Sequence, residues 1–356
     1  MIGALKRRYE SFRGVGESSL AIQALDGAYR PNQLLERAVA RASVPAADNL
    51  IAIGGSLHFS SGADRWLVGP EGKAVHVRRY GGEITAMASE PGGTVAVAVR
   101  EHGVLLEGGM ADGRHIDVPG GADVTALAFD GSAVVLAVGS MTNSTDNWTR
   151  DLMEKGRSGQ IVRHQLSSQE PAILGSGLPY PWGVAVEPGG AILVSACWTN
   201  QILRISRDGS SAVVVDSLPG YPARIVPASG GGYWLSLVAP RNQLLEFVLR
   251  EQEYRRRMIA EIEPKQWIAP AYAPPDSFMQ PMQQGSQRTL GILKPWAPTL
   301  SYGLVALLDK SCKALTSYHS RADGARHGVT SALDLNGELY FTSRGAGEVA
   351  SVPLNR

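Results

Sequence analysis

LPYPWGVAV (residues 178–186) and LPGYPARI (residues 218–225) are the two stretches of this chain that decide its fold. Each is a proline-containing turn that leads into an apolar, β-branched run, which predicts a turn followed by a strand. A glycine-containing turn and a second apolar run follow each of them. The two stretches are therefore interpreted as one structural unit used twice, in which Trp182 and Ala223-Arg224 enter their strands at equivalent places.

The same pattern of turn, strand, tight turn and strand recurs along the chain. Six such hairpins begin near residues 49, 84, 124, 183, 224 and 328, and helical periodicity is scarce. A repeated four-strand unit is typical of a β-propeller, because a single blade cannot bury both of its faces and packs against its neighbours around an axis. We predict one all-β domain over residues 1–356, a six-bladed β-propeller, with residues 1–45 as its N-terminal lead-in and ring closure.

Two segments interrupt this spacing. Residues 141–155 are polar, and the longer segment, 244–300, falls within the fifth predicted blade. Its first part, 244–262, is the best helix candidate of the chain, and its second part, 267–298, is rich in Pro, Met and Gln. Loops of this length in a compact domain are usually lids, interface arms or disordered segments. We expect the second part to cover a site, and the whole insertion to be a candidate interface for a homo-oligomer.

Composition and charge argue against several classes of function. The 356 residues include 34 Lys and Arg and 33 Asp and Glu, and the net charge of +1 gives no reason to expect a nucleic-acid partner. Residues 1–14 are charged and no long apolar run follows, so neither a signal peptide nor a membrane span is expected. Cys197 and Cys312 lack metal-ligand spacing, which argues against structural zinc and favours a cytoplasmic location.

A resemblance to a known family rests on segments distributed over nearly the whole chain. They are DGAYRPNQLLE (26–36), GQIVR (159–163), GLPYPWGVA (177–185), LPGYP (218–222), WLSLVAPRN (234–242), VTS (329–331) and GELY (337–340). In this order they resemble the strictosidine synthase-like proteins, within a wider group of six-bladed propellers that includes gluconolactonases, senescence marker protein and paraoxonases. The resemblance implies the propeller fold, but it does not by itself imply the function, because propellers host many chemistries.

The candidate site follows from the geometry of a propeller, in which the innermost strand of each blade begins at one mouth of the central channel. Alignment of the hairpin starts places seven polar or bulky residues there: Asp48, Asn49, Glu83, Asp123, Trp182, Arg224 and His327. Ordinary structural roles are the alternatives, since aspartates cap turns and a tryptophan can fill a channel. A buried Arg224 needs a counter-ion, either a carboxylate such as Asp48 or Asp123 or an anionic ligand.

The lactonase and paraoxonase branches, by resemblance, imply a divalent metal at this mouth, usually calcium. The positions of its oxygen ligands correspond here to Asp48, Trp182 and Ala223-Arg224. An indole, a methyl group and a guanidinium cannot bind a hard cation, so we expect no metal and no other cofactor. The strictosidine synthases are similar in lacking the metal and are thought to use a glutamate of the last blade, but no glutamate lies near residues 329–331.

The leading hypothesis is therefore a metal-independent small-molecule enzyme, performing hydrolysis, ring opening or a condensation or lyase step. Its substrate would be an anionic or amphipathic organic molecule bound by Arg224, Trp182, Asn49 and Glu83. General acid or base catalysis is assigned to Asp48, Asp123 or His327. Two alternatives stay open: a non-catalytic binding or scaffold propeller whose channel is filled by Arg224 and Trp182, and a metal-dependent lactonase or esterase with relocated ligands.

Overall fold

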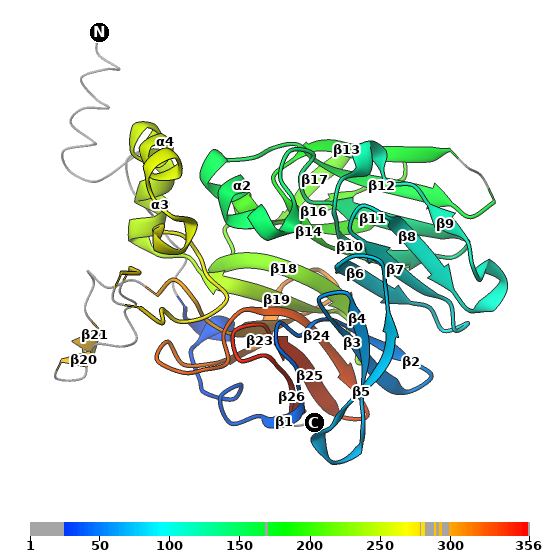
Figure 1. Ribbon diagram of the computed structural model, residues 1–356, viewed down its shortest axis with the longest axis horizontal. Helices are drawn as coiled ribbons and strands as arrows, with labels where there is room; N and C mark the ends of the chain where they lie inside the picture. The colour runs from blue at the N-terminus through cyan, green and yellow to red at the C-terminus, as the bar shows by residue number, and fades with distance from the viewer. Residues whose placement is uncertain are drawn as a thin grey trace, which may run out of the picture.

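The strands form six four-stranded antiparallel sheets arranged as blades around a central channel (Figure 1). This computed structural model describes residues 25–167, 170–277, 279–281, 288–289, 292–293 and 299–354. The innermost strands β2, β6, β10, β14, β18 and β24 contact one another in a closed ring, each touching the next and β24 touching β2. The predicted six-bladed β-propeller is confirmed.

Four blades take consecutive strands in chain order, starting from the channel. The first consists of β2 (Asp48–Ile53), β3 (Ser56–Ser61), β4 (Asp64–Val68) and β5 (Ala74–Arg79). The second consists of β6 (Ile84–Ser89), β7 (Val95–Val99), β8 (Gly103–Glu107) and β9 (His115–Ile116). The third consists of β10 (Val124–Asp130), β11 (Ala133–Val138), β12 (Gly159–Gln165) and β13 (Pro171–Leu178). The fourth consists of β14 (Pro181–Val186), β15 (Ile192–Ala196), β16 (Gln201–Ile205) and β17 (Ser211–Val215).

The last two blades depart from this simple order. The fifth consists of β18 (Gly220–Pro227), β19 (Tyr233–Pro240), β22 (Leu304–Leu308) and β23 (Ala314–His319). The sixth combines β24 (Val329–Leu335), β25 (Glu338–Ser343) and β26 (Glu348–Pro353) with β1 (Val39–Ser43), which pairs with β26 as the outermost strand. An N-terminal strand thus completes the C-terminal blade, which leaves the ring without a gap.

Burial explains why the strands differ in composition. Every residue of β7 (VAVAV) and β11 (AVVLAV) is buried, because the second strand of a blade is covered on both faces by neighbouring blades. The outermost strand β5 (AVHVRR) is mostly exposed and carries charged side chains. Clusters of buried Ala, Val and Leu lie between adjacent blades, such as the one shared by the second and third blades. The apolar inner strands therefore hold the channel rigidly.

In the described part of the chain, the α-helices lie in the two insertions that follow the second strand of a blade. α2 (Trp148–Glu154) lies between β11 and β12, whereas α3 (Gln243–Arg250) and α4 (Gln252–Glu261) lie between β19 and β22. The side chain of Asn242 caps α3 by accepting a hydrogen bond from the backbone N–H of Leu245 at 2.8 Å. Second strands end where the innermost strands begin, so both insertions leave the propeller on the same face, where α2 contacts α4.

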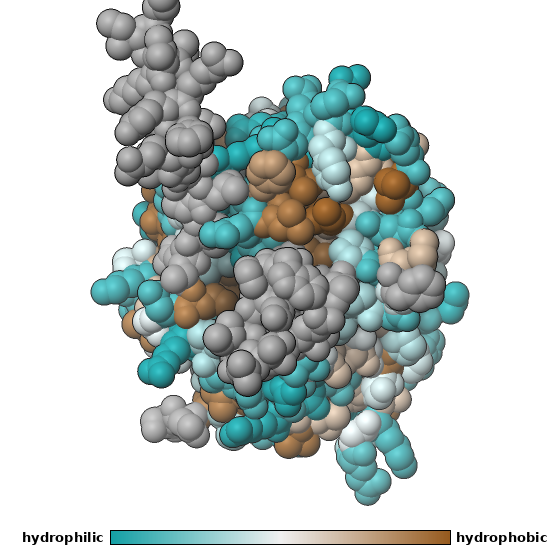
Figure 2. Space-filling view, turned by 90° about the vertical axis from the view of Figure 1, so that its left-hand side faces the viewer, coloured by the Kyte–Doolittle hydropathy of each residue, from teal (hydrophilic) through white to brown (hydrophobic). Residues whose placement is uncertain are grey.

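The long insertion also carries a short hairpin of β20 (Arg288–Thr289) and β21 (Ile292–Leu293). Most of the predicted covering segment after residue 281, like residues 1–24 of the predicted lead-in, lies outside the described residues. On the side that bears α3 and α4, apolar side chains gather among hydrophilic ones (Figure 2). Phe247 and Tyr254 are each 48% exposed in these helices. Among the helices described, none has the length and apolar character needed to cross a membrane.

Candidate functional site

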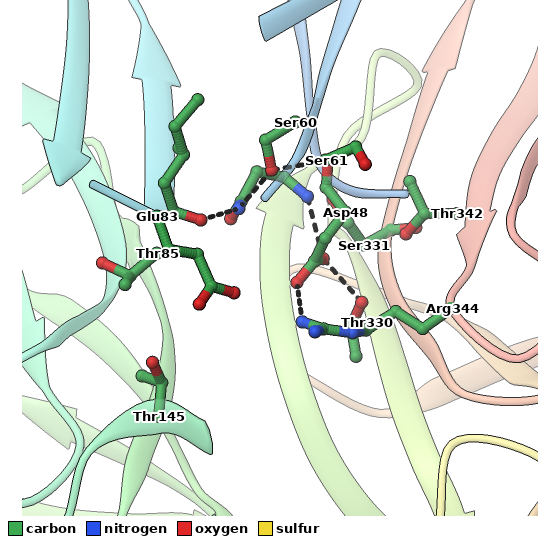
Figure 3. Close-up of polar contacts among 12 residues, drawn as sticks. Asp48, Ser60, Ser61, Glu83, Thr85, Thr145, Thr330, Ser331, Thr342 and Arg344 are labelled. Carbon is green, nitrogen blue, oxygen red and sulfur yellow. Dashed lines mark hydrogen bonds and ion pairs between the residues drawn. The ribbon is translucent and has the colours of Figure 1, made fainter. Parts of the chain in front are cut away.

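A small polar cavity of about 20 Å³ lies at the end of the channel where the innermost strands begin. A volume of this size holds about one water molecule. Its walls are Asp48, Glu83, Ile84, Thr85, Thr125, Thr145, Asp146, Tyr180, Trp182, Arg224, Tyr272 and Arg344. In Figure 3, Asp48, Thr330 and Arg344 lie on one side of this mouth, and Glu83, Thr85 and Thr145 lie on the other. We refer to this cavity and its walls as the mouth.

Asp48 is the centre of the charged groups on one side of the mouth. Asp48 is 5% exposed, and its carboxylate forms ion pairs with Arg224 at 2.7 Å through Oδ1 and with Arg344 at 2.9 Å through Oδ2. The hydroxyl of Thr330 and the backbone N–H of Asn49 also donate to Oδ1, at 2.6 and 2.8 Å. Burial alone would raise the pKa of Asp48, but the two arginines and these hydrogen bonds outweigh it and hold the pKa below its usual value.

Arg224 is fixed by strands of three other blades. Besides its ion pair with Asp48 of β2, its Nη2 donates to the backbone carbonyl of Thr85 at 3.1 Å and its Nη1 to that of Thr330 at 3.4 Å. Arg224 is 8% exposed, and its Nε, also buried, has no hydrogen-bond partner among the residues that the structure describes. The predicted counter-ion of Arg224 is thus Asp48, and the pair closes the channel below the mouth.

Glu83 has the opposite electrostatic environment to that of Asp48. Its side chain is 30% exposed and forms one ion pair, with Nη1 of Arg100 at 2.9 Å. Burial raises the pKa of Glu83, and the neighbouring carboxylates of Asp146 and Asp123 add to this effect, against the lowering effects of Arg100 and Arg344. Glu83 is therefore the carboxylate of the mouth whose proton affinity is increased, as a general acid or base near neutral pH requires.

Aromatic side chains form the remaining wall. Trp182 is 5% exposed, and its ring centroid lies 5.3 Å from that of Trp148 and 5.4 Å from that of Tyr180. Tyr272, from the long insertion, packs against Trp148 at 4.9 Å. The guanidinium of Arg344 lies 4.5 Å from the ring centroid of Tyr272, at cation–π distance. Residues of two insertions thus meet over the mouth and close it.

Two glycines allow the Tyr272 backbone to approach the propeller closely. A Cβ atom on Gly328 would lie 2.6 Å from the carbonyl oxygen of Tyr272, and one on Gly345 would lie 2.3 Å from the same atom. Both distances are shorter than van der Waals contact allows, so a side chain at either position would displace this segment. The closure of the mouth depends on these small residues.

Four of the seven predicted site residues meet at the mouth: Asp48, Glu83, Trp182 and Arg224. Asp123 lies behind the Glu83 wall, where its Oδ2 accepts from Nε of Arg100 at 3.2 Å and from the backbone of Thr145 at 2.8 Å. The amide of Asn49 donates to Ser60 at 2.8 Å and to the carbonyl of Ile84 at 3.3 Å. Asp123 and Asn49 therefore hold the loops and strands that shape the mouth and do not line it.

The prediction that His327 lies at the mouth is wrong. Its Nε2 donates to the carbonyl of Arg321 at 2.6 Å, and its Nδ1 accepts from the hydroxyl of Ser301 at 2.8 Å. Burial lowers the pKa of His327, which favours the neutral imidazole with a hydrogen bond at each ring nitrogen. The imidazole is thus held by Arg321 and Ser301, and His327 is not among the residues that line the mouth.

The site predicted from the sequence does not include Arg344, Arg100 or Tyr272, although Arg344 and Tyr272 line the mouth and Arg100 pairs with Glu83. Arg344 directly follows β25 and Arg100 directly follows β7, both of which are second strands of their blades. Second strands run antiparallel to the innermost strands, so the residues after them reach the same mouth. The ends of the predicted hairpins could have identified both arginines. Tyr272 lies in an irregular segment, and no periodic pattern marks it.

The mouth does not fit a divalent metal. Both oxygens of Asp48 receive guanidinium N–H groups, so cations of the protein occupy the positions that a metal would need. In the part of the chain that the structure describes, no group of three or more His, Cys, Asp or Glu side chains could hold a metal ion. We therefore assign no metal-dependent step to these residues.

Comparisons with known proteins agree with this architecture. The chain is 24% identical to an adipocyte plasma membrane-associated protein of Salmo salar, over 90% of this chain and 78% of the relative. The corresponding protein of Bos taurus is 28% identical, over 57% of this chain and 46% of the relative. The protein strictosidine synthase-like 10 of Arabidopsis thaliana is 28% identical over 28% of each chain. No protein-family model matches the chain.

Solved structures with the same fold include a gluconolactonase from Xanthomonas campestris and a calcium-binding regucalcin from Agrobacterium tumefaciens. The first has a TM-score of 0.53 and 12% identity, over 89% of this chain and 88% of the gluconolactonase. The second has a TM-score of 0.53 and 11% identity, over 88% of this chain and 92% of the regucalcin. At such identities the likeness demonstrates the six-bladed fold alone.

Proposed function

We propose that this homologue of the strictosidine synthase-like and adipocyte plasma membrane-associated proteins is a small-molecule enzyme in which Glu83 transfers a proton at the mouth. The observation that carries this proposal is the contrast between two carboxylates in one cavity. The pKa of Glu83 is raised by burial, whereas Asp48 is held ionised by two arginines. Opposed environments of this kind separate a proton-transferring group from a fixed charge.

Asp48 then acts as a positioning residue. It orients Arg344, whose ion pair with Asp48 uses one of the five N–H donors of the guanidinium. The other donors give Arg344 the capacity to bind the negative or carbonyl oxygen of a substrate, with Tyr272 beneath it. Arg224 serves as the fixed counter-ion of Asp48, and Trp182 supports the aromatic wall.

Binding requires the mouth to open. A cavity of about 20 Å³ holds about one water molecule, whereas small-molecule sites usually have volumes of about 300–1,000 Å³. The segment around Tyr272 closes the mouth through contacts with Trp148 and Arg344. We propose that this segment is a lid, so that hydrolysis, ring opening or condensation takes place after the lid has moved and closed again over an anionic or amphipathic substrate.

A non-catalytic binding or scaffold propeller is the second candidate. The small volume of the mouth favours it, because Trp182 and the Asp48–Arg224 pair then fill the channel and hold the blades together. The two candidates differ in what they require of Glu83. Proton transfer needs its carboxyl group, whereas a structural plug tolerates the isosteric amide.

The test is a screen of lactones, aryl esters and amine–aldehyde pairs with the wild-type protein and the Glu83→Gln variant. We expect turnover that falls at least 100-fold in Glu83→Gln, since general acid–base catalysis contributes about 10²–10⁴-fold. Glu187→Gln is the matched control, because Glu187 is a carboxylate paired with Arg204 far from the mouth. Absence of turnover for every substrate class, or equal turnover in Glu83→Gln, would favour the scaffold.

Location and assembly stay proposals. We propose a cytoplasmic protein, because both cysteines of the chain, Cys197 and Cys312, are buried free thiols. We also propose that residues 244–300 carry any homo-oligomer interface, since Phe247 and Tyr254 are exposed on α3 and α4. Cell fractionation tests the first proposal, and light scattering of wild type and Phe247→Ser tests the second.

A further inference from the structure

We propose that the opposite end of the central channel is a second ligand site, which takes an apolar molecule carrying a positive charge at one end. A half-open cavity of about 390 Å³ lies there, walled by all six innermost strands. Its walls include Ile51 of β2, Met87 of β6, Leu127 of β10, Val184 of β14, Ile225 of β18 and Leu333 of β24. These residues come after the strand starts that form the mouth, so this cavity opens on the other face of the propeller. We call it the channel pocket.

The channel pocket has the size and the lining of a small-molecule site. Its volume lies within the range of about 300–1,000 Å³ that is usual for such sites. Phe129, Val186 and Val226 line the channel pocket and are only half-buried although they are apolar. When an apolar ligand covers apolar surface in a concave pocket, that surface is removed from water, which favours binding.

Arg224 lies at the inner end of the channel pocket, between this cavity and the mouth. Arg224 lines both this cavity and the mouth, and its charge is balanced by Asp48 at 2.7 Å. A ligand that enters from the open end therefore cannot pass through to the mouth. Its apolar part would lie among the strand residues, and its polar end would remain near the rim.

Two carboxylates at the rim set the charge of that polar end. Glu90 and Asp334 line the channel pocket, at the ends of β6 and β24. Asp334 is held by neutral donors, the indole N–H of Trp234 at 2.8 Å and the backbone N–H of Ser229 at 3.1 Å. Oε1 of Glu90 accepts from the hydroxyl of Thr94, and within the described residues neither carboxylate has a basic partner.

Carboxylates at comparable places in the other blades are neutralised. Asp130, at the end of β10, pairs with Arg163 at 2.7 Å, and Glu187, after β14, pairs with Arg204 at 2.6 Å. Neither of these pairs lines the channel pocket. Of these four carboxylates, only Glu90 and Asp334 line the cavity, and within the described residues neither is paired with an arginine. Their negative charge favours a cationic group such as an ammonium.

Three probes that share a ten-carbon chain and differ in their head group test this site: decylammonium, decanol and decanoate. Their binding is measured by isothermal titration calorimetry below their critical micelle concentrations. We expect decylammonium to bind one per chain, at least tenfold more tightly than decanol, and decanoate to bind most weakly. The Ala128→Phe variant, which adds a phenyl group to the half-buried wall of the channel, should weaken all three. Equal affinities for the three heads, or no binding, would overturn the proposal.

Variants at the rim distinguish recognition of the ammonium group in the channel pocket from adsorption of the probe elsewhere on the protein. Glu90→Gln should lower decylammonium affinity at least tenfold and leave decanol affinity unchanged. Glu187→Gln, whose carboxylate is already paired with Arg204, should change neither. Unchanged decylammonium binding in Glu90→Gln would refute the assignment. Glu83→Gln should also bind decylammonium normally, so failure of the mouth as a catalytic site would not affect this result.

Discussion

The two ends of the central channel are built from the same six strands, yet they have opposite properties. At the mouth, charged side chains form buried ion pairs and leave a cavity of about 20 Å³. At the other end, mostly apolar walls leave about 390 Å³, and the carboxylates of Glu90 and Asp334 have no basic partner in the described ranges of the chain. The insertions account for part of the difference, because they follow second strands and therefore cover only the mouth. The same ring of six innermost strands thus carries two unlike sites, one at each end of the channel.

A substitution in the buried charge cluster of the mouth should cause the largest change in the free energy of unfolding. Asp48→Asn removes the carboxylate that balances Arg224 and Arg344, and loss of one partner from a buried ion pair costs about 3–5 kcal/mol. We expect a decrease of this order in the free energy of unfolding, measured by urea denaturation at pH 7. Arg257→Ala breaks an exposed pair with Glu261 and should cause no measurable change.

The pH dependence of this effect has a definite sign. The folded-state pKa of Asp48 lies below its unfolded value, so its stabilisation is fully present above a pH of about 4 and is lost as the pH falls through the folded-state pKa. The difference in the free energy of unfolding between wild type and Asp48→Asn should therefore become smaller only at acidic pH. A difference of less than about 1 kcal/mol at pH 7 would contradict a strongly coupled pair.

A substitution that disturbs the closure of the mouth should have an intermediate effect on the protein. Gly345→Ala places a Cβ atom 2.3 Å from the carbonyl oxygen of Tyr272, and overpacking of this kind costs about 1–3 kcal/mol unless the lid moves. We expect faster amide hydrogen exchange in residues 267–277, measured by mass spectrometry. Gly230→Ala is the control, because no atom lies within 4 Å of its added Cβ. Unchanged exchange in Gly345→Ala would show that Tyr272 does not form a lid.

Glu83 should give the smallest change in stability, and with the opposite sign to Asp48. Its folded-state pKa is raised, so the ionised form destabilises the native state at neutral pH, and this cost disappears as the pH falls below its unfolded pKa of about 4. Glu83→Gln should raise the free energy of unfolding at pH 7 by less than about 1 kcal/mol, a gain limited by the lost pair with Arg100. Urea denaturation at pH 7 and pH 4 measures it, and a lower stability of Glu83→Gln at pH 7 would refute the raised pKa.

The sequence predicted the parts of the molecule that depend on periodicity. Alternating runs separated by glycine turns defined six hairpins, and the starts of those hairpins correctly placed Asp48, Glu83, Trp182 and Arg224 at one mouth. The same rule failed at His327, whose imidazole is hydrogen-bonded to Arg321 and Ser301 and does not line the mouth. Side-chain partners of this kind leave no mark in hydrophobic patterning.

Contacts between distant, irregular segments could not be predicted. Tyr272 reaches Arg344 from an insertion without repeated structure, and its approach depends on Gly345 in another blade. The pairing of charges was equally hidden, since the sequence does not reveal that Asp130 and Glu187 have arginine partners while Glu90 has none among the described residues. Such pairings follow from register and side-chain reach, which only the assembled propeller specifies.

The contrast between the two ends of the channel is tested most directly by a crystal structure of the protein under xenon pressure. Xenon enters apolar cavities and avoids polar sites that are filled by ion pairs and water. We predict xenon density in the channel pocket among β2, β6, β10, β14, β18 and β24, and none at the mouth between Asp48 and Glu83. Xenon at the mouth, or an empty channel pocket beside occupied cavities elsewhere in the crystal, would contradict this account.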